Sequence, residues 1–203
     1  MNALGVVILA AGASSRMGCP KMLLPWKSTS VVGALIEQWS GLRAAQIAIV
    51  IAQNDQSIRT ELLRICFPQE NWIVNPHPIK GMFSSIQTAA RWPKWQSAIT
   101  HWAIALGDQP HLPQSLLAKL ISFVDAHPHS ICQPSRHGRA RHPVFLSRAC
   151  FEQLKETTQS NLKEYLTAHS ADRVLLEIDH PALDLDMDYP ADYQRAQEIG
   201  NES

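Results

Sequence analysis

The sequence lacks a surplus of charge of either sign. Its 203 residues include 18 Lys and Arg against 18 Asp and Glu, so the formal net charge is +0. This balance disfavours a protein that binds nucleic acid through an overall positive charge, although a local basic patch is still possible. Hydrophobic residues make up 45% of the chain, which suffices for a sizeable core and argues against disorder. We therefore expect one folded domain over residues 1–203, with no nucleic acid as partner.

Long hydrophobic runs and paired cysteines are also missing. No apolar stretch reaches the roughly 18 residues that a membrane-spanning helix needs, so we expect no membrane association. The apolar run at residues 1–11 has no basic segment before it and is poorly suited to be a signal peptide. Cys19, Cys66, Cys132 and Cys150 form no C-x-x-C pair, which disfavours a zinc ribbon or a redox motif. Scattered thiols of this kind predict a reducing, cytoplasmic location.

Several well-known catalytic motifs are absent as well. The chain has no G-x-x-x-x-G-K-[ST] loop, no G-x-G-x-x-G and no H-E-x-x-H, and it has no G-x-S-x-G elbow. These absences disfavour a P-loop NTPase, a dinucleotide-binding dehydrogenase, a zinc protease and an α/β-hydrolase. The chemistry has to be sought in other segments.

Short apolar runs alternate with amphipathic stretches along most of the chain. This alternation predicts an α/β fold with a Rossmann-like, mostly parallel sheet between two helix layers, an α/β/α arrangement. We expect strands at 4–9, 46–51, 72–74, 102–106, 130–133, 143–146 and 173–178. We expect helices at 32–42, 58–65, 81–92, 116–124, 148–155 and 161–169, and a last one after Pro190. Ligands bind such sheets at the carboxyl ends of the strands, so the loops there are the places to search.

The loop after the first strand has the composition of a phosphate site. Its glycines allow close approach of the backbone to a ligand, and its successive N–H groups can surround phosphate oxygens. Two cations in this loop suit the negative charge of a triphosphate. An ordinary strand–helix turn with two solvated cations would also account for the pattern. The candidate nucleotide-binding residues are Leu9, Ala10, Ala11, Gly12, Ser14, Ser15, Arg16 and Lys21.

Carboxylates follow a later strand and recur near the C-terminus. Asp108 comes directly after the strand at 102–106, while Asp184, Asp186 and Asp188 alternate with apolar residues. In an extended segment these three acids would point to one side. Mg²⁺ commonly uses one or two protein carboxylates together with phosphate oxygens, so Asp108 and the acidic cluster at 184–188 are candidates to bind one Mg²⁺. A helix-capping Asp108 and a solvated acidic edge are the alternatives.

Two further segments offer groups for recognition. Asn75, Gly81, Met82 and Ser85 surround the start of a predicted helix, where N–H and hydroxyl donors could bind a base or sugar; a simple capped helix is the alternative. The basic stretch at 136–142 includes Arg139 and His142, which are candidates to bind an anionic acceptor, unless the stretch is a solvated loop.

These motifs together resemble a known family. Residues 9–21 match L-A-A-G-x-S-x-R-M-G-x-x-K, a signature of the molybdenum cofactor nucleotidyltransferases, which are MobA-like NTP transferases. Segments similar to that family's other motifs follow in the same order over almost the whole chain, at 75–85, 107–110, 141–143 and 186–193. The A-A-G form of the first loop resembles the branch that transfers CMP. Two positions depart from the pattern: Arg141 stands in place of a glycine, and Tyr189 in place of a threonine.

The resemblance implies a fold of the nucleotide-diphospho-sugar transferase type and an Mg²⁺-dependent transfer. A phosphate of a molybdopterin-type acceptor attacks the α-phosphorus of a nucleoside triphosphate, CTP in this branch, and pyrophosphate leaves. Arg16, Lys21 and Asp108 are the implied catalytic residues, with Asp108 and Asp188 on the metal. A molybdoenzyme or its chaperone is the implied protein partner.

Other functions remain as alternatives. They are transfer from GTP, transfer to a sugar or polyol phosphate, and a non-catalytic nucleotide-binding accessory role. The full set of Lys21, Asp108 and Asp188 disfavours the last of these, because binding alone does not need it.

Overall fold

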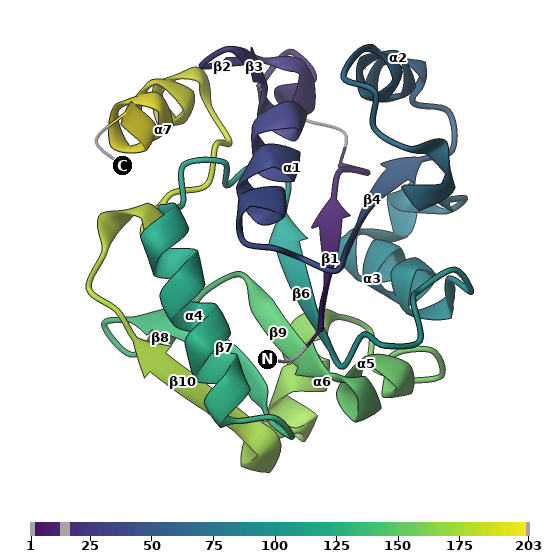
Figure 1. Ribbon diagram of the computed structural model, residues 1–203, viewed down its shortest axis with the longest axis vertical. Helices are drawn as coiled ribbons and strands as arrows, with labels where there is room; N and C mark the ends of the chain where they lie inside the picture. The colour runs from purple at the N-terminus through teal and green to yellow at the C-terminus, as the bar shows by residue number, and fades with distance from the viewer. Residues whose placement is uncertain (1–2, 13–16, 202–203) are drawn as a thin grey trace.

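The alternation of strands and helices in the sequence produces a mixed, mostly parallel sheet flanked by helices. The computed structural model describes residues 3–12 and 17–201. Figure 1 shows the central strands β1 and β6 side by side. The strands are β1 (Leu4–Leu9), β2 (Pro25–Trp26), β3 (Thr29–Ser30), β4 (Gln46–Ala52), β5 (Trp72–Asn75), β6 (His101–Leu106), β7 (Ile131–Arg136), β8 (Arg139–Ala140), β9 (Val144–Ser147) and β10 (Arg173–Glu177).

Seven α-helices connect and cover these strands in the described ranges. They are α1 (Val31–Gly41), α2 (Gln56–Arg64), α3 (Met82–Arg91), α4 (Gln114–Ala126), α5 (Arg148–Gln153), α6 (Leu162–Ala168) and α7 (Pro190–Asn201). Side chains cap several of them: Ser30 accepts from the Gly33 N–H, and Asp55 accepts from the Ile58 N–H. In the part of the chain that the structure describes, no helix is long and apolar enough to cross a membrane.

The main sheet has eight strands, of which seven follow the order β10-β7-β9-β6-β1-β4-β5 and β8 pairs with β7. β1 runs parallel to both β4 and β6, so the carboxyl ends of these three strands lie at one edge. β9 is antiparallel to β6 and β7, and β8 is antiparallel to β7. The predicted fold class is confirmed, with its antiparallel part confined to β8 and β9.

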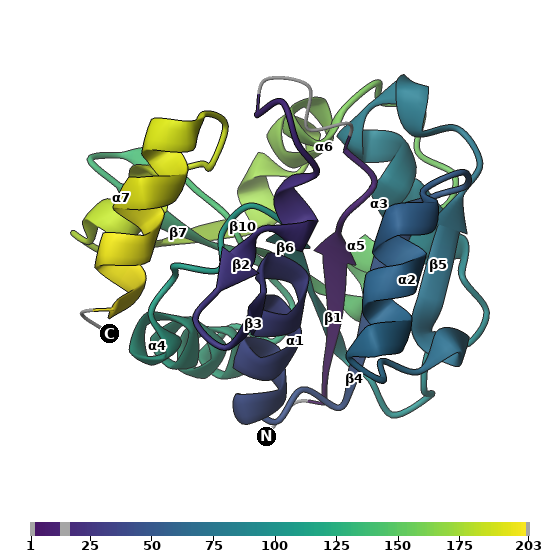
Figure 2. The ribbon, with the colours of Figure 1, turned by 90° about the horizontal axis from the view of Figure 1, so that it is seen from above.

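Alternating side chains of each central strand build two separate cores. On one face Val6 and Ile8 pack in a cluster with residues of α1, α2, α4 and α7, and on the other Val7 packs with residues of α3, α5 and α6. Figure 2 shows the sheet between these two helix layers. Burial on both faces explains why the strands read as continuous apolar runs.

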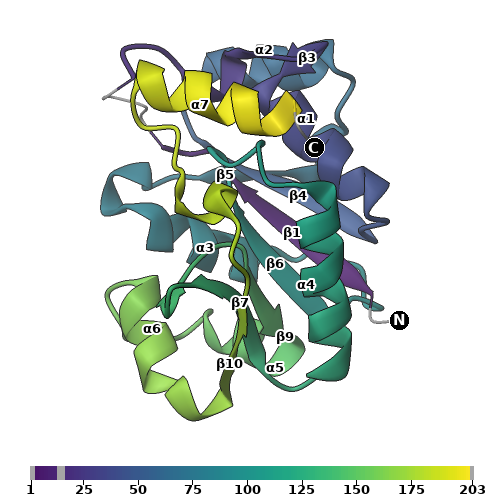
Figure 3. The same cartoon turned by 90° about the vertical axis from the view of Figure 1, so that its left-hand side faces the viewer.

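Helix α7 packs against the short β2–β3 hairpin, as Figure 3 shows. The rings of Tyr193 and Trp26 lie 6.2 Å apart between centroids, and the Tyr193 hydroxyl donates a hydrogen bond to the Pro25 carbonyl. Gly200 permits this approach, since a Cβ there would lie 2.8 Å from the Trp26 ring. Asp188, two residues before this helix, lies beside the segment that carries Lys21.

Candidate active site

A cavity of about 790 Å³ opens where strands β1 and β6 end. Its walls come from the segment after β1, the segment after β6, the start of α3 and the chain before α7. The described lining residues are Leu9, Ala10, Ala11, Gly12, Met17, Lys21, Met22, Ala52, Asp55, Pro78, Ile79, Gly81, Met82, Ser85, Leu106, Gly107, Asp108, Asp186 and Asp188. Ten of the residues proposed from the sequence are among them, so the fold brings together segments that lie far apart along the chain.

Lys21 lies between the two carboxylates at the base of this site. Its Nζ is 3.0 Å from Asp108 Oδ2 and 3.1 Å from Asp188 Oδ1. Lys21 is on a 3₁₀ turn (Lys21–Leu23), whereas Asp108 follows β6 and Asp188 precedes α7. The two acids are thus neighbours across one ammonium group despite their 80-residue separation in sequence.

The electrostatics of the cavity are dominated by carboxylates. Among the described lining residues, Asp55, Asp108, Asp186 and Asp188 are acidic and Lys21 is basic. Burial lowers the pKa of Lys21, but Asp108 and Asp188 outweigh this and hold the pKa above its ordinary value. Desolvation, together with the Asp108 charge, raises the pKa of Asp186. Such a site favours the binding of a cation, which would neutralise the carboxylates before an anionic ligand binds.

The segment after β6 also holds the acidic segment in place. Gln109, which is buried, donates from Nε2 to Asp186 Oδ1 over 2.9 Å. The buried His111 contacts the Ala182 carbonyl through Nε2 at 3.1 Å. Because a carbonyl oxygen only accepts, Nε2 donates in this contact, and burial lowers the pKa of His111 below its ordinary value. The residues around Asp108 therefore fix the position of the residues around Asp188.

Asn75 supports the opposite wall without lining the cavity. Its buried side chain donates from Nδ2 to the hydroxyls of Ser84 and Ser85, at 2.9 Å each, and accepts from the His77 N–H. Gly81 opens α3 with φ at 83°, a left-handed conformation that glycine adopts without strain. The structure therefore places Gly81, Met82 and Ser85 at the cavity and gives Asn75 a framework position behind them.

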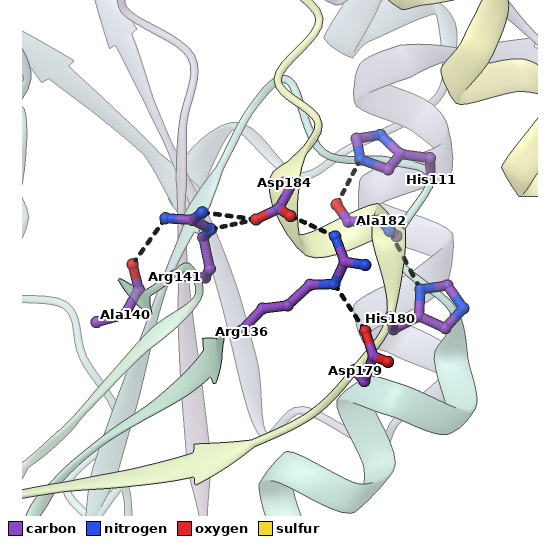
Figure 4. Close-up of polar contacts among 8 residues, drawn as sticks. All are labelled: His111, Arg136, Ala140, Arg141, Asp179, His180, Ala182 and Asp184. Atoms are coloured by element: carbon purple, nitrogen blue, oxygen red, sulfur yellow. Dashed lines mark hydrogen bonds and ion pairs between the residues drawn. The ribbon is translucent and has the colours of Figure 1, made fainter. Parts of the chain in front are cut away.

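Asp184 does not join the other two acids of its alternating pattern. Leu185 and Met187 are buried, as the alternation predicts, but Asp184 ends a 3₁₀ helix (Pro181–Asp184) and turns elsewhere. Figure 4 shows its carboxylate between two guanidinium groups. Arg141 donates from Nε at 2.7 Å and approaches with Nη2 at 2.6 Å, and Arg136 donates from Nη1. Hydrogen bonds from the two arginines lower the pKa of Asp184.

The same ion pairs give Arg141 a structural partner. This arginine stands where the family pattern has glycine, and it ties the end of the β7–β8 hairpin to the acidic segment. Arg136 extends the cluster through Asp179, whose Oδ1 lies 3.0 Å from Arg136 Nε. The expectation that the three acids of 184–188 point to one side, as in an extended segment, is therefore wrong for Asp184.

The remaining candidates lie elsewhere or outside the described part. Arg139 is exposed on β8, and neither it nor His142 is among the described cavity-lining residues. Burial lowers the pKa of His142, although the Ile104 backbone and the Asp108 charge act in the opposite direction. Ser14, Ser15 and Arg16 lie outside the described residues.

Several lining residues carry no motif that the sequence analysis could use. Met22, Ala52, Asp55, Pro78, Ile79 and Leu106 are at the cavity, together with Met17, which lies within the motif of residues 9–21 but was not proposed as a site residue. Of these residues, Asp55 could best have been placed from the sequence, because an aspartate between a buried strand and a helix is a typical N-cap. Ile79 is 97% exposed at the start of the wall that Gly81 and Met82 continue, and a fully exposed isoleucine has no periodic signature.

A mixed α/β sheet with a lysine and paired carboxylates in a cavity at its carboxyl edge defines an α/β protein that binds a ligand at the ends of its strands. The sequence profile of the MobA-like NTP transferase domain matches residues 6–174. The chain therefore belongs to this family.

Individual relatives agree with the assignment. The chain is 27% identical over 201 residues to the molybdenum cofactor cytidylyltransferase of Escherichia coli, covering 98% of this chain and 97% of that protein. It is 30% identical over 141 residues to the molybdenum cofactor guanylyltransferase of Mesorhizobium japonicum, covering 68% and 64%. A solved nucleotidyl transferase from Methanothermobacter superposes with a TM-score of 0.81 at 16% identity, over 100% of this chain and 99% of that one, which supports the fold.

Proposed function

We propose that this protein transfers CMP from CTP to the terminal phosphate of a molybdopterin-type acceptor and releases pyrophosphate. The observation that carries the proposal is the convergence of Lys21, Asp108 and Asp188 beside the loop formed by residues 9–12. Similarity over nearly the full length to a cytidylyltransferase supports the choice of reaction. The A-A-G sequence of residues 10–12 favours cytidine, while the guanylyltransferase relative makes GTP the second candidate donor.

The described residues fit a divalent cation bound with the donor. Asp108 Oδ1 is buried and has no hydrogen-bond partner among the described residues, so it offers a free ligand atom. Asp108 and Asp188 are already close enough to share one cation, because both contact the same ammonium. Two carboxylates suit Mg²⁺, which takes one or two protein carboxylates and completes its shell with phosphate oxygens and water.

In the proposed reaction an acceptor phosphate oxygen forms a bond to the α-phosphorus of CTP. The bond between this phosphorus and the bridging oxygen of the leaving pyrophosphate breaks, and a phosphoanhydride results. The nucleophile is already anionic, so no general base is needed. The protein contributes position and charge stabilisation, as in other phosphoryl transfers.

Each part of the site has a task in this scheme. The backbone of residues 9–12 would lie against the triphosphate, and Lys21 would neutralise charge on the leaving pyrophosphate. Asp108 and Asp188 would hold Mg²⁺, which when bound supplies charge neutralisation for the donor phosphates. The wall at Gly81 and Ser85, braced by Asn75, would contact the nucleoside.

Product analysis with four nucleotides tests this function. The protein is incubated with Mg²⁺, molybdopterin and CTP, GTP, ATP or UTP, and pyrophosphate and the dinucleotide product are measured. The proposal predicts product with CTP above the other three. Equal or greater product with GTP would overturn the choice of base, and the absence of pyrophosphate with every nucleotide would indicate an accessory binding role. Pyrophosphate release with a sugar phosphate, but none with molybdopterin, would overturn the acceptor.

A further inference from the structure

One ammonium group occupies the space between the two carboxylates that the proposed function gives to the metal. Lys21 Nζ contacts Asp108 Oδ2 and Asp188 Oδ1, and the side chains of the three residues are 15%, 20% and 29% exposed. A cation is therefore held between these oxygens by the protein itself. The inference developed from this contact rests on the proposed function.

The ammonium and a bridging divalent cation cannot both occupy this space. Mg²⁺ binds carboxylate oxygens at about 2.1 Å, so an ion shared by the two facing oxygens would overlap the position of Lys21 Nζ. The two cations would also repel each other strongly at such a separation. Binding of a metal between Asp108 and Asp188 thus requires Lys21 to move away.

In the free protein, Lys21 neutralises part of the negative charge of the cavity. Asp55, Asp108, Asp186 and Asp188 all line the cavity, and Lys21 is the basic residue among the described lining residues. Without a cation, the like charges of Asp108 and Asp188 would repel each other and separate. Lys21 therefore keeps the pair close together before any ligand arrives.

A triphosphate would provide Lys21 with new partners inside the same cavity. The lysine belongs to a short 3₁₀ turn and carries its charge on a flexible four-carbon stem, so small torsional changes redirect the ammonium. Residues 9–12, which would contact the phosphates, line the same cavity. The lysine can therefore exchange carboxylate oxygens for phosphate oxygens without a change in the fold.

We infer that Lys21 is a built-in counterion that holds Asp108 and Asp188 together in the free protein and gives its place to the divalent cation when the triphosphate binds. In the absence of nucleotide the metal has to displace Lys21 and binds weakly. Triphosphate draws Lys21 away and thereby strengthens metal binding. By thermodynamic reciprocity, the metal strengthens triphosphate binding by the same factor.

Substitution of Lys21 by glutamine separates the two ligands experimentally. Mn²⁺ binding to the whole protein is measured by electron paramagnetic resonance without nucleotide, and CTP binding is measured by calorimetry. Lys21→Gln removes the competing charge, so we expect Mn²⁺ alone to bind about tenfold more tightly than to the unaltered protein, a change equivalent to one strong charge contact. CTP should bind at least about tenfold more weakly, because its phosphates lose a cation.

Two further variants control for charge and for folding. Lys119 is exposed on α4, away from the cavity, and Lys119→Gln makes the same change in net charge; neither affinity should change. Lys21→Arg keeps a cation between the carboxylates, and Mn²⁺ alone should bind to it as weakly as to the unaltered protein. This comparison remains informative if Lys21→Gln folds poorly.

The outcomes distinguish this inference from the proposed function. Mn²⁺ binding that weakens or stays unchanged in Lys21→Gln would overturn the exchange, while pyrophosphate release by the unaltered protein would still support the transferase. Mn²⁺ binding that strengthens equally in Lys119→Gln would overturn the exchange as well, because only overall charge would matter. A protein that binds no Mn²⁺ with or without CTP would overturn both proposals.

Discussion

Replacement of Asp108 and Asp188 by asparagine, singly and together, should give opposite kinds of non-additivity in stability and in activity. Each carboxylate contacts the same Lys21 ammonium, at 3.0 and 3.1 Å. At an effective dielectric constant of about 20, one such pair attracts by about 5 kcal/mol before desolvation is counted. Each single substitution leaves Lys21 with one carboxylate and relieves repulsion among the acids of the cavity. We therefore expect each to lower the free energy of unfolding by at most about 1 kcal/mol.

The double variant leaves a half-buried ammonium without either carboxylate. We expect it to lose about 1–2 kcal/mol more than the sum of the single variants, which is within the usual range of coupling between neighbouring residues. Urea unfolding of the four proteins at neutral pH measures this coupling. Additive losses of stability would show that Lys21 is not shared between the two acids.

Activity should behave in the opposite way. Each single substitution should lower kcat/KM for CTP with Mg²⁺ by about 100-fold or more, as removal of one transition-state contact commonly does. The double variant should be at most about threefold worse than the worse single variant, since residues that act as a unit are not additive. Pyrophosphate release measures these rates. Fully multiplicative losses would refute the shared site and would assign Asp108 and Asp188 independent roles.

Three further substitutions test the supporting structure. Asn75→Ala removes three hydrogen bonds from a buried side chain and should lower stability by about 2–4 kcal/mol while raising KM for the nucleotide; an unchanged KM would mean that the wall it braces does not contact the donor. Arg141→Gly restores the residue of the family pattern and should cost about 1–2 kcal/mol in urea unfolding, because it removes a half-exposed ion pair and adds backbone freedom; no loss would refute the structural role. Burial lowers the pKa of His101 below its ordinary 6.5, so the unfolded chain binds the proton first and stability should fall as the pH drops below 6.5; His101→Gln should reduce this slope by up to about 1.4 kcal/mol per pH unit, and an unchanged slope would contradict the burial argument.

The sequence predicted the strands and helices of the fold well because burial on two faces leaves a strong periodic signal. The predicted strand at 46–51 is Gln46–Ala52 in the structure, and the predicted helix at 116–124 is part of Gln114–Ala126. The hairpin strands β2 and β3 were not predicted, since strands of two residues show no periodicity. The antiparallel direction of β9 was not specified either, because strand direction depends on tertiary pairing.

Residues of the candidate site could be predicted where they directly follow a strand. Contacts between segments that are distant in sequence could not. Asp108 and Asp188 could be proposed as neighbours because Asp108 follows a strand and Asp188 ends the acidic alternation before Pro190. Both positions were expected to reach the cleft at the carboxyl ends of the strands. The Lys21 bridge between them was not foreseen, since a lysine in a phosphate loop gives no sign of an acidic partner 167 positions away. The partnership of Arg141 with Asp184 was missed for the same reason, because it joins two segments separated by 43 positions.

The most direct test is a crystal structure of the protein with Mn²⁺ and a non-hydrolysable CTP analogue, in which anomalous scattering locates the metal. The account predicts one Mn²⁺ bound by Asp108, Asp188 and phosphate oxygens, with Lys21 Nζ moved from the carboxylates to the phosphates. A triphosphate bound elsewhere, or an Mn²⁺ remote from both aspartates while Lys21 keeps its present contacts, would contradict it.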